Sequence, residues 1–266
     1  MRVLIVLALV GAVLAVPRQL SRIVGGSPAT IEEYPFITSL QFSRWGIFHS
    51  PSCGGSLITK TAVLSAAHCF YQAESPVQWR VRLGSANSTS GGTVHDVSRI
   101  IMHENFVYVS MLHDVAIIRL RVAAKLSSTI ALARIAGNYY LPDNALVYAA
   151  GWGRLSGDEP QRPEQLLHAD INVINHELCR QRYALLKTLP DYRDWPEVTP
   201  EMLCHGILDV GGKDTCLGDS GGPITHNKNV IVGVISWSFG CAHPFFPGVS
   251  ARVSSYSTWI YDHSVS

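Results

Sequence analysis

The sequence predicts an all-β fold of the barrel or sandwich kind. Its predicted strands are short, rich in β-branched or aromatic residues, and bounded by Gly, Pro, Asn, Ser or Asp. Many such strands at close spacing favour a barrel or sandwich over alternating α/β units. The 266 residues suffice for one large domain or two smaller ones. The predicted strands are residues 36–42, 56–65, 78–83, 100–101, 115–122, 145–150, 167–174, 224–225, 230–237 and 248–253.

The first 15 residues are typical of a secretory signal peptide. Arg2 supplies the positive start, and residues 3–16 form an apolar run interrupted only by Gly11. An apolar run of about 14 residues is too short to span roughly 30 Å of hydrocarbon. Small residues around Ala15 offer a cleavage site, so we expect a secreted, extracellular protein that does not span a membrane.

Residues 16–22 form a short polar segment that ends in Arg22, and the apolar start Ile23-Val24-Gly25-Gly26 follows it. A basic residue directly before such a start predicts a removable activation peptide. The alternative is an ordinary flexible terminus.

The last dozen residues predict a helix that packs on the barrel, with Ser254 or Ser255 as its N-cap. A change of composition at residues 136–142 predicts a linker. We therefore expect an N-terminal unit over residues 23–138 and a C-terminal unit over residues 139–266. Helical spacing relates Tyr256, Trp259, Ile260 and His263.

The charge and cysteine patterns exclude several classes of function. The net charge is +1 and 15% of residues are charged, so we expect no nucleic-acid partner. An even count of six cysteines without a C-x-x-C pair favours disulfides in a secreted chain, with 15 possible pairings. The eleven histidines include no H-E-x-x-H arrangement, so we expect neither a metal nor another cofactor.

Three stretches carry candidate chemistry. Ser220 lies in Gly218-Asp219-Ser220-Gly221-Gly222, where glycines leave room around a hydroxyl that needs a general base to become a nucleophile. His68 ends a strand-like run, and imidazole is the natural base near neutral pH. Asp114 starts an apolar strand, where it could orient an imidazole. Singly, each has an ordinary alternative: a surface turn, a core histidine and a strand cap.

Several motifs of this kind occur in order: Ile-Val-Gly-Gly at 23–26, Ser-Ala-Ala-His-Cys at 65–69, Asp-Val-Ala-Ile-Ile at 114–118, Gly-Trp-Gly at 151–153, Gly-Asp-Ser-Gly-Gly-Pro at 218–223 and Ser-Trp at 236–237. Together they resemble the chymotrypsin-type serine peptidases and, within them, the trypsins. Residues 208–214 and 246–260 are similar to insect, particularly moth, trypsins. The resemblance covers the chain from Ile23 onward. It implies two packed six-stranded antiparallel β-barrels with a C-terminal α-helix.

The resemblance also implies roles for the motif residues. Ser220 would be the nucleophile, His68 the general base and Asp114 the residue that orients it. Backbone N–H groups of Gly218 and Ser220 would form the oxyanion hole. The implied disulfides are Cys53–Cys69, Cys179–Cys204 and Cys216–Cys241.

Activation and substrate binding follow from the same resemblance. Cleavage after Arg22 would free an Ile23 ammonium that pairs with Asp219. Ser236 and Trp237 would carry the edge against which an extended substrate adds as a strand.

Asp214 would lie at the base of the specificity pocket and select Arg or Lys. Gly248 matches one glycine of the pocket wall, whereas Ser238 stands where typical trypsins have the other. Asp214 therefore favours trypsin-like specificity, and Ser238 keeps a chymotrypsin- or elastase-like specificity open.

Two surface loops add to these expectations. The segment between Cys179 and Cys204 is long for the family, and its Tyr192 and Trp195 could contact substrate, although a tolerated insertion is the simpler interpretation. The loop 84–92 has no carboxylate, so we expect no calcium site there. Within it, Asn87 begins a glycosylation sequon.

We therefore expect a secreted serine endopeptidase, made as a zymogen, that acts as a monomer on protein or peptide substrates. Macromolecular protease inhibitors are further expected partners. Digestion of dietary protein and degradation of yolk proteins both suit this chemistry. A protease-like binding protein without activity is the alternative from another class, and the complete set His68, Asp114 and Ser220 argues against it.

Overall fold

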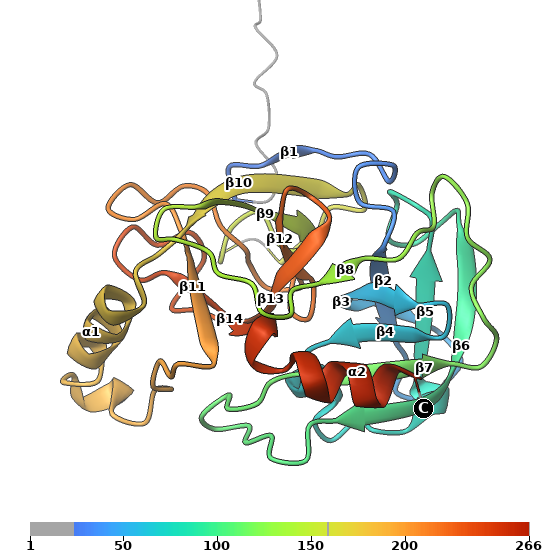
Figure 1. The fold of residues 1–266 in the computed structure, drawn as a ribbon, viewed down its shortest axis with the longest axis horizontal. Helices are drawn as coiled ribbons and strands as arrows, with labels where there is room; N and C mark the ends of the chain where they lie inside the picture. The colour runs from blue at the N-terminus through green and yellow to red at the C-terminus, as the bar shows by residue number, and fades with distance from the viewer. Residues whose placement is uncertain (1–23, 159, 266) are drawn as a thin grey trace, which may run out of the picture.

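The computed structural model describes residues 24–158 and 160–265. Most of this part of the chain forms two closed six-stranded antiparallel β-barrels (Figure 1), which confirms the predicted fold class. The expected signal and activation peptides, together with Arg22 and Ile23, lie outside the described residues.

The first barrel is closed in the order β2-β3-β4-β7-β6-β5. Its side chains alternate between a buried and a more exposed face along β5, as a half-buried strand requires. The bounds are β2 Ile37–Phe42, β3 Ser50–Thr59, β4 Ala62–Ser65, β5 Trp79–Leu83, β6 Thr93–Met102 and β7 Ala116–Leu120.

The second barrel runs β9-β10-β11-β14-β13-β12 and closes because β9 pairs with both β10 and β12. Two short strands extend it, β1 on β10 and β8 in parallel on β13. The bounds are β1 Ser27–Pro28, β8 Arg134–Ile135, β9 Leu146–Gly151, β10 Leu167–Val173, β11 Met202–Gly206, β12 Pro223–His226, β13 Val230–Trp237 and β14 Gly248–Arg252.

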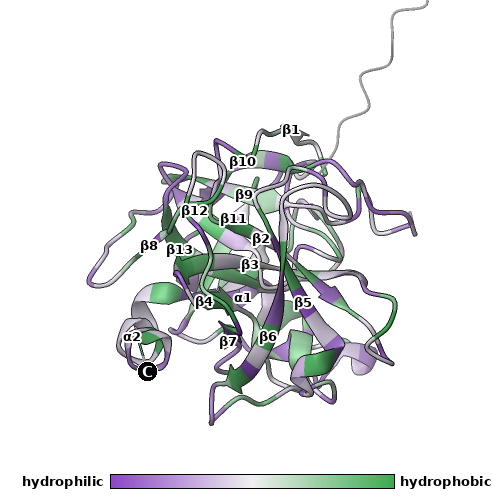
Figure 2. Cartoon of the chain, turned by 90° about the vertical axis from the view of Figure 1, so that its right-hand side faces the viewer, coloured by the Kyte–Doolittle hydropathy of each residue, from purple (hydrophilic) through white to green (hydrophobic). Residues whose placement is uncertain are grey.

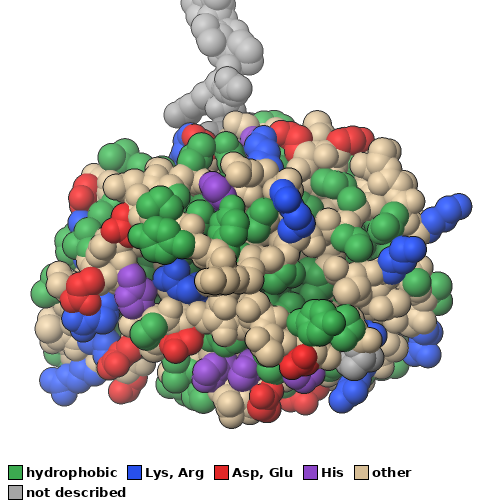
Figure 3. All heavy atoms as spheres, viewed as in Figure 1, with side chains coloured by type: hydrophobic (Ala, Val, Ile, Leu, Met, Phe, Trp, Pro, Cys, Tyr) green, Lys and Arg blue, Asp and Glu red, His purple; other side chains and the backbone are tan. Residues whose placement is uncertain are grey.

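Buried apolar side chains form one cluster within the first barrel and another that spans both barrels. The strands that contribute them include many hydrophobic residues (Figure 2). One core cluster joins Ile37 and Ile117 of the first barrel to Ile171 and Val234 of the second. The two barrels therefore share a continuous core. On the face in Figure 3, acidic and basic side chains are interspersed, in keeping with the near-neutral net charge.

The predicted terminal helix is present as α2, Ser257–Val265, and it packs Ile260 onto the shared core, as does Tyr256 directly before it. It begins later than predicted, because residues Val253–Ser255 form a 3₁₀ turn (η4) first. Short 3₁₀ segments also occur at Ala67–Phe70 (η1), Pro76–Gln78 (η2) and Pro190–Tyr192 (η3). Within the described residues, the helices are too short or too polar to cross a membrane.

Two predicted strands are wrong in extent. Residues 56–65 are not one strand: the chain reverses at Lys60 and Thr61, where the Thr61 N–H donates to the Thr59 hydroxyl at 3.2 Å. The short strand predicted at 100–101 is part of the ten-residue β6, whose other residues are largely polar and exposed.

The helix α1, His176–Leu186, and the strand β11 are absent from the prediction. Asn175 caps α1 by accepting from the Leu178 N–H at 2.9 Å. A disulfide joins Cys179 in α1 to Cys204 in β11, and both residues are buried. Tyr183 of α1 packs its ring against Trp237 at a centroid distance of 4.8 Å, so this helix supports the end of β13.

Replacing Cys179 and Cys204 together by Ala tests how far this disulfide stabilises the second barrel. Closing a loop of 25 residues restricts the unfolded chain, so we expect the free energy of unfolding to fall by about 3 kcal/mol. Denaturant unfolding measures this, and unchanged stability would contradict the expectation.

Candidate active site

His68 and Asp114 are brought together by two neighbouring strands of the first barrel. Because Ser65 at the end of β4 pairs with Ala116 at the start of β7, the residues just beyond them lie side by side. The His68 backbone N–H donates to Asp114 Oδ1 at 2.8 Å, and Nδ1 bonds Oδ2 at 2.6 Å. With the proton on Nδ1 facing the carboxylate, Nε2 keeps its lone pair and can accept another proton.

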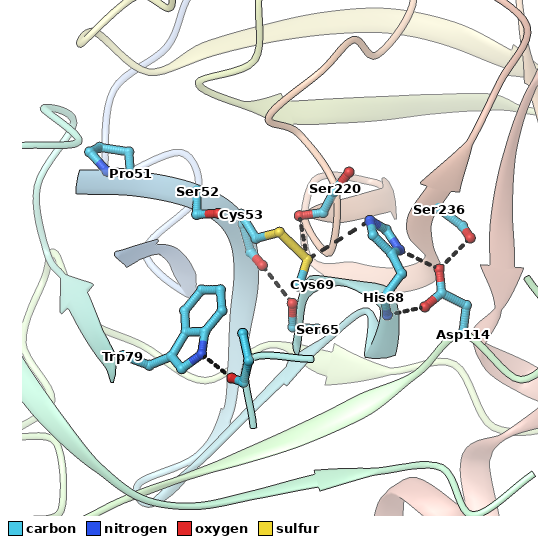
Figure 4. The surroundings of a disulfide bond; sticks show 12 residues. Pro51, Ser52, Cys53, Ser65, His68, Cys69, Trp79, Asp114, Ser220 and Ser236 are labelled. Atoms are coloured by element: carbon cyan, nitrogen blue, oxygen red, sulfur yellow. Dashed lines mark hydrogen bonds and ion pairs between the residues drawn. A yellow bond between two sulfur atoms is a disulfide. The ribbon is translucent and has the colours of Figure 1, made fainter. Parts of the chain in front are cut away.

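Ser236 is the partner of Asp114 from the second barrel. The pairing of β13 with β14 is irregular between Ile235 and Trp237, so Ser236 lies at a bulge. A bulge redirects a side chain out of the regular ladder. The Ser236 hydroxyl donates to Asp114 Oδ2, which makes the carboxylate a link between the two barrels (Figure 4).

The pKa values of the pair shift in opposite directions. Burial alone would raise the pKa of Asp114, but the charge of His68 and the hydrogen bonds from His68 and Ser236 outweigh it and lower that pKa. Burial alone would lower the pKa of His68, whereas the Asp114 carboxylate raises it overall. Asp114 therefore stays ionised, and a proton on the imidazole is stabilised.

Ser220 lies beside this pair (Figure 4), and backbone hydrogen bonds tie its segment to both barrels. The Gly54 N–H of β3 donates to the Ser220 carbonyl at 2.8 Å, and the Gly221 N–H donates to the Ile235 carbonyl at 2.8 Å. Gly221 has a φ of +76°, and a Cβ there would meet the Ser65 hydroxyl at 2.1 Å. Glycine is therefore required next to Ser220 both by backbone angle and by space.

His68 and Ser220 line the same cavity of about 790 Å³. Several parts of the chain form its other walls: the loop between β6 and β7, the loop between α1 and β11, the residues around the end of β13, Gly157, and the segment 215–217 before Ser220. Among the lining residues are Tyr108, Val109, Met111, Asp191, Asp194, Trp195, Pro196, Trp237 and Ser238.

Asp214 and Gly248 lie beneath this cavity and are not among its lining residues. Asp214 is 2% exposed, and the adjacent Thr215 forms the cavity wall. The Asp214 carboxylate accepts from the Thr215 N–H at 2.8 Å and the Gly248 N–H at 3.1 Å. Ser238 does line the cavity, but its hydroxyl donates to the Gly240 carbonyl at 2.6 Å.

Asp219 is the second buried carboxylate near Ser220. Its oxygens accept from the Gly153 N–H at 2.7 Å and the Cys216 N–H at 3.0 Å, and both donors are uncharged. Burial raises its pKa to about 6, against the smaller opposing effect of these N–H groups. A Cβ at Gly151 or Gly153 would lie 2.2 Å from the carboxylate, so glycines make room for it.

Gly218 has a φ of +104°, an angle that favours glycine. The Arg162 guanidinium packs directly against it, since a Cβ at Gly218 would lie 2.7 Å from Arg162 Cζ. Arg162 also donates to the carbonyls of Pro51 and Ser52 at 3.2 and 3.0 Å. The sequence analysis does not identify this basic side chain beside the nucleophile loop.

The described cysteines form the same three disulfides that the resemblance implies: Cys53–Cys69, Cys179–Cys204 and Cys216–Cys241.

In the part of the chain that the structure describes, one group of side chains has atoms close enough together to bind a metal ion: Cys53, His68 and Cys69. Its two sulfurs are joined to each other, so they cannot act as thiolate ligands.

The side chain of Asn87 in the sequon forms hydrogen bonds both within its own loop and to Glu164. Its Oδ1 accepts from the N–H groups of Thr89 and Ser90, both at 2.9 Å. Its Nδ2 donates to Glu164 at 3.1 Å. A glycan would have to be attached to this nitrogen, so it would replace the contact with Glu164.

Two antiparallel barrels with a His-Asp pair and a serine between them define the class of chymotrypsin-like serine hydrolases. The family model described as Trypsin matches residues 23–260. The chain belongs to the trypsin family and is a trypsin-like serine endopeptidase.

The curated relatives agree with the family model. "Trypsin, alkaline A" of Manduca sexta is 45% identical over 99% of this chain and 100% of that protein. "Trypsin CFT-1" of Choristoneura fumiferana is 42% identical over 94% of this chain and 93% of its own length. "Vitellin-degrading protease" of Bombyx mori is 35% identical over 90% and 84%.

Titration of Asp219 predicts how the uncleaved chain responds to pH. Because its pKa is raised in the fold, the folded chain binds this proton more tightly than the unfolded chain does. The stability from this group is present at low pH and is lost as pH rises through about 6. Between pH ~4 and ~8 the loss is about 2 kcal/mol.

The Arg22→Gln chain, with and without Asp219→Asn, tests this by denaturant unfolding at both pH values. We expect the chain with Asp219→Asn to gain in relative stability as pH rises. Asp96→Asn is the matched control, because the Asp96 side chain is 64% exposed and should show little change. The raised pKa of Asp219 would be contradicted if the effect of Asp219→Asn on the free energy of unfolding were the same at both pH values.

Proposed function

We propose that the chain is a secreted zymogen which, after cleavage between Arg22 and Ile23, hydrolyses peptide bonds after Arg or Lys. The observation that carries the activity is the bonded pair of His68 and Asp114, with Ser220 on the same cavity. The expected signal sequence at residues 1–15 supports secretion.

The chemistry follows from the positions of three side chains. Ser220 Oγ attacks the scissile carbonyl while His68 Nε2 takes its proton. The bonds from His68 to Asp114 fix the imidazole with Nδ1 protonated, and the carboxylate stabilises the imidazolium that forms. His68 then gives the proton to the leaving amine, and water releases the acyl group from Ser220 by the same route.

The oxyanion of the tetrahedral intermediate needs donors that are aimed before charge develops. We assign the backbone N–H groups of Gly218 and Ser220 to this task. The left-handed backbone at Gly218 supports the assignment, because it is an angle that other residues adopt with strain.

Activation is the step that Asp219 performs in this proposal. Its carboxylate is buried and has uncharged hydrogen-bond partners in the described part of the chain. An ammonium at Ile23, freed by cleavage, would supply the missing opposite charge. The segment 214–220 would then rearrange, since Asp219 shares it with Asp214, Gly218 and Ser220.

Specificity for Arg or Lys rests on Asp214. A carboxylate below the cavity attracts a cationic side chain and is an unfavourable neighbour for an apolar one. Activation would have to open the wall at Thr215 for a substrate side chain to reach it. Chymotrypsin- or elastase-like specificity is the alternative, favoured by Ser238 on the cavity wall.

We propose a digestive or yolk-degrading role. The relatives named "Trypsin, alkaline A" and "Vitellin-degrading protease" support these two roles through the similarity of their sequences. Tissue of expression distinguishes the two.

Two chromogenic peptides that differ only in Arg or Phe before the scissile bond test the specificity. For the cleaved protein we expect kcat/KM to be at least about a hundredfold higher with Arg, because a buried carboxylate discriminates charge strongly. Ser220→Ala is the control for the chemistry and should lower kcat by about 10⁴-fold or more. A preference for Phe would instead support the alternative specificity.

The variant Arg22→Gln tests activation. We expect it to be secreted and folded but inactive, because the ammonium that pairs with Asp219 cannot form. Secretion is measured by immunoblot of the medium, and activity with the Arg peptide after treatment with an activating trypsin that is removed before the assay. Full activity of the uncleaved variant would overturn the activation mechanism without affecting the assignment of Ser220, His68 and Asp114.

A further inference from the structure

A histidine that the proposed mechanism does not use is bonded directly to Asp214. His205 lies in β11 and is fully buried, at 0% exposure. Its Nδ1 is 3.0 Å from Asp214 Oδ1, and its Nε2 is 2.8 Å from the hydroxyl of Ser250 in β14. The register of β11 on β14 places His205 opposite Gly248, whose missing side chain leaves room for the ring. A Cβ at Gly248 would lie 2.5 Å from His205 Cε1.

A series of hydrogen bonds joins Asp214 to His205 and His205 to Ser250. In this arrangement the imidazole can carry either one proton or two, and only hydrogen atoms need to move between the two states. A carboxylate has only acceptors, so Nδ1 carries a proton towards Asp214. The Ser250 hydroxyl can rotate: it donates to Nε2 when the imidazole is neutral and accepts from Nε2 when the imidazole is charged. The pair of Asp214 and His205 therefore has a net charge of −1 or 0 in the same geometry.

The neighbouring groups that we find do not offset the change in net charge of Asp214 and His205 between −1 and 0. Lys213 precedes Asp214 but pairs with Asp170 at 2.7 Å on the surface. Asp219, in the following turn, is also anionic when it ionises. Tyr183 of α1 donates its hydroxyl to the Pro247 carbonyl, and burial raises its pKa, so it remains neutral. From β14, Gly248 and Ser250 contribute uncharged donors.

We propose that His205 is a positioning residue that makes the preference for Arg or Lys depend on pH. With a neutral imidazole, Asp214 presents its full charge to a cationic side chain. With an imidazolium, the pair is neutral and the electrostatic reason for choosing a cation is lost. The inference deepens the proposed function, since it requires an active enzyme with Asp214 below its specificity pocket.

Substrate binding should in turn change the protonation of His205. A cationic side chain that approaches Asp214 disfavours a second positive charge on His205, so its binding expels the proton from the imidazole. An uncharged side chain of the same shape has no such effect. The consequence is a KM for Arg substrates that rises as pH falls, with a smaller change in kcat.

Two peptide substrates that differ only in Arg or its uncharged isostere citrulline before the scissile bond test the proposal on the cleaved enzyme. The ratio of their kcat/KM values cancels the titration of His68 and Asp219, because both substrates need these groups equally. Imidazole titrates between about pH 5 and 8. Over this range we expect the Arg/citrulline ratio to fall about tenfold towards low pH.

Variants separate this role from a merely structural one. His205→Gln can still donate to Asp214 but cannot titrate, so its ratio should be independent of pH. Ser250→Ala removes the acceptor for the second imidazole proton, so the midpoint of the ratio should move to lower pH. If the His205→Gln variant folds poorly, the pH midpoint of the Ser250→Ala variant still tests the proposal.

The possible results are distinguishable. A wild-type ratio that does not change with pH overturns the role of His205 while leaving the proposed function intact. A pH-dependent ratio that persists unchanged in His205→Gln overturns it as well, because another group must then titrate. Failure to cleave either substrate at any pH contradicts the proposed function itself.

Discussion

Three carboxylates are buried near the cavity, and the arrangement of their partners governs much of the surrounding structure. Asp114, Asp214 and Asp219 are each 2% exposed or less. An ionised carboxylate is costly to bury unless hydrogen bonds or an opposite charge replace its water. Each aspartate meets this requirement in a different way: Asp114 with an imidazole, a hydroxyl and a backbone N–H, Asp214 with an imidazole and two N–H groups, and Asp219, among the described residues, with two backbone N–H groups.

These differences match the tasks that we propose for the three residues. Asp114 is fully partnered in the uncleaved chain, and the pKa shifts keep it ionised beside His68. Asp219 has no positively charged hydrogen-bond partner in the described residues, and its raised pKa is the expected consequence. The Arg162 guanidinium opposes the raised pKa of Asp219 only in part, so we expect this carboxylate to respond to a new ammonium more strongly than Asp114 would. The pair of Asp214 and His205 is intermediate, because the partner of the carboxylate changes charge.

The sequence predicts those elements of the structure that short stretches of neighbouring residues determine. The short strands predict an all-β barrel or sandwich, and the spacing of the last dozen residues predicts the terminal helix. That there are two barrels is implied only by the family resemblance that the motifs around His68, Asp114 and Ser220 carry. The predicted strand at 56–65 is wrong because its turn at Lys60 and Thr61 contains no Gly or Pro and depends on the Thr59 hydroxyl. The helix α1 is missed because its buried face includes Arg182, which interrupts the apolar periodicity.

His205 could not be predicted in the same way, because its partners are distant in sequence. Asp214 is nine residues away and Ser250 is 45 residues away, and only the pairing of β11 with β14 brings them together. Within β11, a buried histidine between Cys204 and Gly206 carries no periodic signal. The same holds for Ser236, whose contact with Asp114 arises from a bulge in β13.

Ser238 and His205, the two residues that bear on the proposed specificity, therefore differ in their expected effect. Ser238 attracts attention in the sequence because it replaces a glycine of the pocket wall, but its hydroxyl is already bonded to Gly240 in its own loop. Its remaining effect is one of size at the cavity wall. His205 is not among the cavity-lining residues, yet it contacts the Asp214 carboxylate, to which we assign the selection of a cation. Because a unit charge acts over several ångströms in a dry interior, we expect this buried contact to have the larger influence on the proposed specificity.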